Sequence, residues 1–112
     1  MKQQEDNYSN ELLQLRQQLD LIDQEIITLL LRRFEITDEV GVLKAYNKKT
    51  IEDPVREAEI LEKIKLKIIA GGQCEGNDHS DMLALHICEI YKSIMHQSKL
   101  KQDVMVKLSQ TT

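Results

Sequence analysis

Helix-breaking residues are scarce in this sequence, whose 112 residues include one proline and four glycines. So few turn-forming residues disfavour an all-β or βαβ architecture and favour long helices. Tryptophan is absent and aromatic residues make up only 4%, so we expect no stacking platform for single-stranded nucleic acid. A net charge of −4 also argues against a protein that binds phosphate backbones. The sequence predicts an all-α protein without a nucleic-acid partner.

Long apolar runs and a hydrophobic leader are missing as well. Uninterrupted apolar stretches such as 29–31 are too short to span a bilayer, and the polar start MKQQEDNYSNE lacks a signal-peptide core. Cys74 and Cys88 have neither metal-knuckle nor redox-pair spacing, so we expect two reduced thiols and no metal site. These features predict a cytoplasmic protein that does not interact with membranes.

Apolar residues recur at steps of three and four between Leu12 and Leu43, which is typical of one helix face. We therefore expect a first helix over about residues 10–45. At about 1.5 Å per residue it would be roughly 50 Å long, whereas a compact monomer of this size is only about 30–35 Å across. Such a helix would extend beyond its own domain, which predicts a partner chain.

Two further helices are expected, which makes the order long, short, long in a single domain of residues 1–112. Asp53 as N-cap and Pro54 at the first helical position start a helix over about 54–70. A third helix is expected over about 80–106. Its inward face is predicted to carry four large apolar residues, namely Leu83, Ile87, Ile90 and Ile94.

Arg33 occupies a position in the apolar stripe of the first helix where a hydrophobic residue is expected. Burial of an unpaired guanidinium costs several kcal/mol, so Arg33 requires an anionic partner. That partner is either an internal carboxylate, such as Glu39 or Glu57, or a ligand. Lys44 lies three turns further along nearly the same face, about 16 Å away, so the two side chains could hold one small anion between them.

Arg16 lies about 25 Å before Arg33 on the same helix, too far to share a small ligand with Lys44 of its own chain. In a dimer with antiparallel long helices, Arg16 of one chain would lie beside Arg33 of the other. The geometry thus predicts two composite sites per dimer. Arg56 and Glu57, just inside the second helix, could close one side of each site.

Ser93 and Gln97 are neighbours on the third helix, and Gln97 continues its predicted apolar stripe. A glutamine at such a position needs hydrogen-bond partners. It is therefore either a paired interface residue or a ligand contact.

The spacing of these residues resembles that of the all-α chorismate mutases. The matching motifs are Leu15-Arg16-x-x-Leu19-Asp20-x-Ile22-Asp23, Leu29-Leu30-x-x-Arg33, Val40-Gly41-x-x-Lys44, Asp53-Pro54-x-Arg56-Glu57 and Ser93-x-x-x-Gln97. The resemblance covers about residues 10–100. It implies an intertwined homodimer of three-helix chains that converts chorismate to prephenate in phenylalanine and tyrosine biosynthesis. This unimolecular rearrangement requires neither metal nor cofactor.

The resemblance also implies a role for each matching residue. Arg33 and the partner's Arg16 would bind the two substrate carboxylates, a task that suits a forked guanidinium. Lys44 and Gln97 would donate hydrogen bonds to the ether oxygen, where negative charge grows in the transition state. The remaining contacts would be Asp53 and Glu57 to the ring hydroxyl, Arg56 as an ordering residue and Ser93 to a carboxylate.

Two other functions remain open at this point. An isochorismate-pyruvate lyase shares the fold and much of the cationic set, although Glu57 favours the mutase because the lyase needs no acceptor for a ring hydroxyl. A non-catalytic subunit of a helical dimer is the other alternative. It would require internal partners for Arg33 and Gln97.

Overall fold

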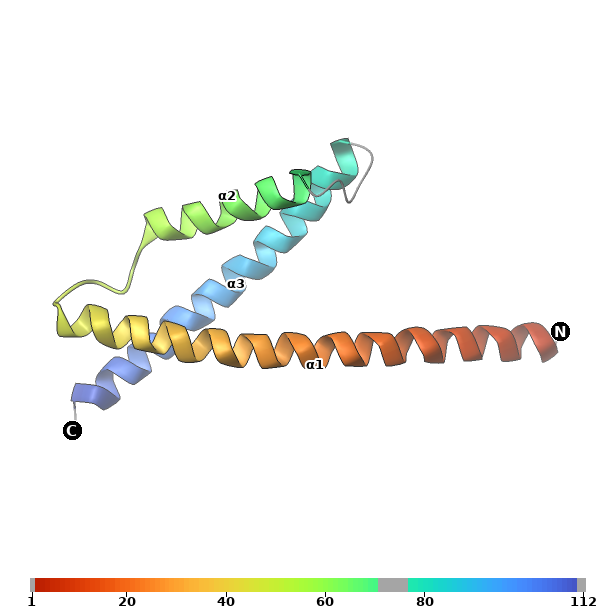
Figure 1. Cartoon of the computed structure of the whole chain (residues 1–112), viewed down its shortest axis with the longest axis horizontal. Coiled ribbons are helices and arrows are strands. Elements are labelled where there is room, and N and C mark those ends of the chain that lie inside the picture. The colour runs from red at the N-terminus through yellow and green to blue at the C-terminus, as the bar shows by residue number, and fades with distance from the viewer. Residues whose placement is uncertain (1, 71–76, 111–112) are drawn as a thin grey trace. The chain divides into compact units, whose positions relative to one another are not determined.

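The computed structural model describes residues 2–70 and 77–110 and contains, within these ranges, three helices and no strand. The helices are α1 (Lys2–Tyr46), α2 (Pro54–Ala70) and α3 (Asn77–Gln110) (Figure 1). This confirms the all-α class. Cys74 and the two glycines at 71–72 lie outside the described residues.

The bounds of α2 agree with the sequence prediction, whereas both long helices extend further than predicted. α1 begins at Lys2 instead of about residue 10, and α3 covers Asn77–Gln110 instead of about 80–106. The prediction placed the helix ends where the apolar stripe ends. Polar residues without proline or glycine can continue a helix beyond its apolar stripe, and the segment before residue 10 contains neither.

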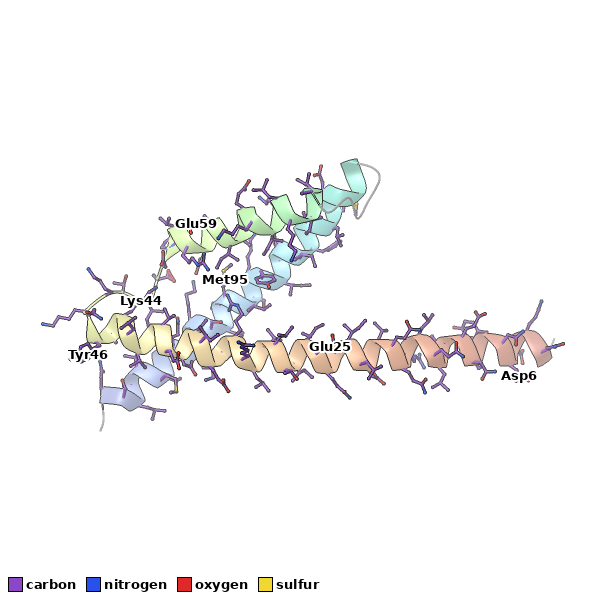
Figure 2. The ribbon with its side chains drawn as sticks, viewed as in Figure 1. Asp6, Glu25, Lys44, Tyr46, Glu59 and Met95 are labelled. Atoms are coloured by element: carbon purple, nitrogen blue, oxygen red, sulfur yellow. The ribbon has the colours of Figure 1, made fainter. Side chains whose placement is uncertain are left out.

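The chain divides into two compact units, residues 1–36 and 37–112. The first unit consists of the larger, N-terminal part of α1, from which side chains such as Asp6 and Glu25 project (Figure 2). Its apolar stripe is exposed, with 56% of Leu19, 47% of Ile26 and 63% of Leu29 accessible to solvent. A single helix has no second element of its own against which to bury such a stripe.

The second unit contains the end of α1 from Thr37 together with α2 and α3, and α2 packs along α3 (Figure 1). The buried face of α3 has residues at helical spacing, namely Ala84, Cys88, Met95, Ser98 and Gln102. Cys88 is a free thiol whose Sγ lies 3.8 Å from the carbonyl oxygen of Leu61 on α2. These residues form the core of the unit.

This buried face of α3 lies one residue further along than the sequence predicts. Ile90, expected to point inward, is 55% exposed in the single chain, whereas Cys88 is 3% exposed. The small side chains of Ala84 and Cys88 allow the backbones of two helices to come closer than larger side chains would. The larger apolar residues consequently lie toward other faces of the helix.

The turn between α1 and α2 places their ends close together. Lys48 adopts a left-handed conformation (φ 57°), which is common just after a helix end, and the amide of Lys49 donates to the carbonyl of Lys44 at 2.7 Å. Asp53 caps α2, because its Oδ1 accepts a hydrogen bond from the Arg56 amide at 3.1 Å. The predicted N-cap is confirmed, and it fixes the first turn of α2.

Candidate functional site

Lys44 lies in the last turn of α1 and reaches the segment that precedes α2 (Figure 2). Its Nζ lies 3.5 Å from Asp53 Oδ2 and donates to the carbonyl oxygen of Ile51 at 3.3 Å. Only 24% of the Lys44 side chain is exposed. Both oxygens of the Asp53 carboxylate are therefore engaged, one by the helix cap and one by Lys44.

A second lysine, Lys99 on α3, holds two carboxylates from the neighbouring elements. Its Nζ lies 2.8 Å from Glu52 Oε1 and 2.9 Å from Glu57 Oε1. These hydrogen bonds, the one to Glu52 first, raise the pKa of Lys99 above its ordinary value of 10.5. Lys99 thereby joins the turn, α2 and α3, and sequence analysis did not select it.

The two lysines and their three carboxylate partners form one cluster, which we call the acid–lysine cluster. Its members are Lys44, Glu52, Asp53, Glu57 and Lys99. Three negative and two positive charges give it a formal charge of −1. The sequence-predicted residues Lys44, Asp53 and Glu57 are thus brought together within the second unit.

Gln102 packs between α3 and the end of α1. It is only 6% exposed, and its Nε2 donates to the carbonyl oxygen of Thr37 at 2.6 Å. Gly41 lies directly against it, since a Cβ built on this glycine would meet Gln102 Cγ at 2.9 Å. Ser98, one turn before Gln102, is also buried, and its hydroxyl donates to the Ile94 carbonyl at 2.9 Å.

The pair predicted from the sequence, Ser93 and Gln97, is exposed in the single chain. The reason is the shifted packing of α3: residue 97 continues the stripe of large apolar residues, whereas α2 packs against the stripe that leads to Ser98 and Gln102. The sequence contained a signal for this other packing of α3, because the spacing Ser-x-x-x-Gln occurs twice, at 93–97 and at 98–102.

The three arginines predicted for the site are not members of the acid–lysine cluster. The Arg56 side chain lies 3.7 Å from Glu59 one turn along α2, and both are more than half exposed, so this pair adds little stability. Arg16 is exposed and Arg33 is partly buried in the first unit. Their association with Lys44 in one site stays a prediction.

A further ion pair lies beside Gln102. Lys101 contacts Oδ2 of Asp38, a side chain that is only 12% exposed. The other carboxylate oxygen of Asp38 has no hydrogen-bond partner among the residues that the structure describes. Asp38 and Thr37 are consecutive in α1, so Lys101 and Gln102 together attach this turn of α1 to α3.

Within residues 2–70 and 77–110 there is no cluster of three or more His, Cys, Asp or Glu side chains that could hold a metal ion. No helix in this part of the chain is long and apolar enough to cross a membrane. The described site contains lysines, which can donate hydrogen bonds to a small polar ligand, and carboxylates, which can accept them.

Comparisons with known proteins give one consistent result. The family described as chorismate mutase type II matches residues 15–103. The bifunctional chorismate mutase/prephenate dehydratase of Escherichia coli K12 is 30% identical over 98 residues, which cover 88% of this chain and 23% of that protein. The protein of the same name from Aquifex aeolicus is 43% identical over 54 residues, or 48% of this chain and 15% of that protein. The chain thus spans less than a quarter of the length of these relatives, and no solved structure matches it.

Proposed function

The chain belongs to the chorismate mutase type II family, and from this premise we propose that it converts chorismate to prephenate in aromatic amino acid biosynthesis. The observation that carries the proposal is the family match over residues 15–103, which includes every polar residue of the candidate site. The reaction is an intramolecular rearrangement, so the site must hold a compact substrate conformer and stabilise the charge that develops as the C–O bond breaks.

Lys44 and Gln97 are the proposed donors to the ether oxygen. Lys44 is supported by its position at the junction of α1 and α2. Gln97 is supported by its place within the family match and by its exposure, which leaves its amide accessible to a ligand. Negative charge on that oxygen is greater in the transition state than in the substrate, so donors aimed at it lower the barrier. Gln102 is the weaker candidate, because it is buried and its amide already donates to the Thr37 carbonyl.

The two substrate carboxylates are assigned to arginines. Arg33 would bind one of them and Arg16 of the partner chain the other, in a homodimer whose long helices run antiparallel. The exposed apolar stripe of the first unit supports a second copy of the chain as the cover for that stripe. Association would bury residues such as Leu19 and Leu29. Each Å² of apolar surface that is removed from water stabilises the dimer by about 25 cal/mol.

The ring hydroxyl is assigned to Glu57 and Asp53. Glu57 is the better acceptor, because Asp53 already uses both carboxylate oxygens for the helix cap and Lys44. Arg56 would order the start of α2 through its backbone amide. Ser93 would assist a carboxylate.

The central test is to add chorismate and follow the loss of its ultraviolet absorbance. Prephenate as the product supports the proposal, whereas pyruvate and salicylate formed from isochorismate would support the lyase. Absence of turnover, together with no binding of a dianionic bicyclic transition-state analogue, would leave the non-catalytic helical subunit. Arg33→Ala and Lys44→Ala should each lower kcat/KM by at least ~10²-fold, and near-wild-type rates in both would refute the site.

The two glutamines form a matched pair for the donor assignment. Gln97→Ala should lower kcat/KM by at least ~10²-fold, while Gln102→Ala should act mainly through stability, because the Gln102 amide already donates to the Thr37 carbonyl inside the protein. A rate close to that of the wild type in Gln97→Ala, with a large loss in a folded Gln102→Ala chain, would assign the donor role to Gln102. Circular dichroism of both variants separates loss of the donor from loss of the fold.

Mixing inactive Arg16→Ala chains with inactive Lys44→Ala chains tests whether the site is shared. A heterodimer of the two contains one site with both defects and one with neither, so activity should return. No recovery would place each site within a single chain.

A further inference from the structure

Within the acid–lysine cluster, the side chain of Lys99 is the least exposed after that of Lys44. Its exposed fraction is 27%. One ammonium group contacts two carboxylates, Glu52 in the turn and Glu57 in α2, at 2.8 and 2.9 Å. Single exposed ion pairs contribute little because solvent competes with them. A lysine that bridges two carboxylates from different elements fixes their positions more strongly, since neither can move without losing a charged hydrogen bond.

Glu57 is held in its orientation by this arrangement. Among the residues that the structure describes, Lys99 is the cation paired with Glu57, through Oε1. The backbone of Glu57 is fixed separately, because its amide donates to the carbonyl oxygen of Asp53 at 3.0 Å. Without Lys99, the Glu57 carboxylate would lose the ion pair that fixes the orientation of its side chain.

A hydroxyl acceptor must present a lone pair toward the hydroxyl group. Lys99 contacts Oε1 of Glu57, so Oε2 is the oxygen that would accept a hydrogen bond from the substrate. Resting on the proposed function, we propose that Lys99 is a positioning residue that keeps the Glu57 carboxylate turned toward the ring hydroxyl of the substrate, with Glu52 as its anchor. Lys99 acts through Glu57 and does not touch the reacting atoms.

The test compares Lys99→Met with Lys92→Met. Lys92 is on the same helix and makes a 2.8 Å pair with Glu89, but both side chains are more than half exposed and lie outside the cluster. We expect Lys99→Met to raise KM for chorismate about tenfold with kcat changed less than about threefold, because the ring-hydroxyl contact is made in both ground state and transition state. Lys92→Met should leave both constants unchanged, and Lys99→Arg should restore most of the loss.

A double variant separates positioning from a purely structural role. In a Glu57→Gln background, Lys99→Met should have almost no further effect on KM. Glu52→Gln, which keeps Lys99 and Glu57 but weakens the anchor, should change KM in the same direction by a smaller factor.

The outcomes are distinguishable. An active wild type with unchanged KM in Lys99→Met overturns this inference and leaves the proposed function intact. An equal loss of activity in the presence and absence of Glu57 also overturns it, because Lys99 would then act on the substrate directly. An inactive wild type overturns the proposed function and this inference with it. If Lys99→Met does not fold, Glu52→Gln and Lys99→Arg provide the same comparison.

Discussion

Gly41→Ala is the most direct test of how α1 packs against α3. A Cβ at this position would lie 2.9 Å from Gln102 Cγ and 3.0 Å from Gln102 Cβ. Both atoms belong to the base of the side chain, so a change of rotamer at its far end cannot relieve the contact. Either α3 moves away from α1 or the glutamine gives up its 2.6 Å hydrogen bond to Thr37.

The expected size of the effect follows from three opposing contributions. Alanine is favoured over glycine inside a helix by about 1 kcal/mol. Overpacking costs about 1–3 kcal/mol, and a buried amide that loses its partner costs about 1–3 kcal/mol. With either cost offset by about 1 kcal/mol of helix propensity, the substitution should lower the free energy of unfolding by up to about 2 kcal/mol, even though helix propensity alone predicts stabilisation.

Urea unfolding followed by circular dichroism measures this difference, and a chorismate assay on the same samples measures the effect on the site. The control is the double variant Gly41→Ala with Gln102→Ala, in which the contact with Cγ no longer exists. The penalty for Gly41→Ala should be smaller in that background. A Gly41→Ala chain that is more stable than the wild type by about 1 kcal/mol would refute the close packing of α1 on Gln102.

Three other substitutions probe separate contacts. Lys101→Met should lower the free energy of unfolding by about 1–3 kcal/mol in urea titrations, because it leaves the enclosed Asp38 carboxylate unpaired; no change would mean that water already solvates that carboxylate. Asp53→Ala should cost about 1 kcal/mol through the lost cap, and Asp53→Asn, which can still cap, should cost less. The raised pKa of Lys99 means that its ion pairs contribute fully below pH 10.5 and are lost as pH rises through that raised value; Lys99→Met should thus show a smaller alkaline decrease in unfolding midpoint than the wild type.

The local signals in the sequence predicted local structure well. Asp53 and Pro54 placed the start of α2 correctly, because a cap and its helix are separated by only a few residues. The lack of glycine and proline predicted the long helices but not their ends. Lys2 lies well before the apolar stripe on which the estimate for α1 depended.

The face of α3 that packs inside the chain could not be predicted in the same way. Two stripes of the helix, one residue apart, both carry apolar residues and both end in a Ser-x-x-x-Gln pair. The choice between them depends on α2, which fits closely against Ala84 and Cys88. Lys99 was missed for a related reason, since its partner Glu52 is 47 residues away and periodicity within a helix contains no information about such contacts.

The ion pair of Lys44 with Asp53 sets a condition on how an anion would bind at the proposed site. Lys44 already holds the carboxylate of Asp53, so an incoming carboxylate displaces an existing partner instead of filling an empty cationic site. Binding at this lysine is then an exchange, and its free energy is the difference between two similar ion pairs. Such a difference is small for any singly charged acid that touches Lys44 alone. A strong preference for a dicarboxylate therefore requires a second cation in the site, which is the role that the proposed function assigns to Arg33 and to Arg16 of the partner chain.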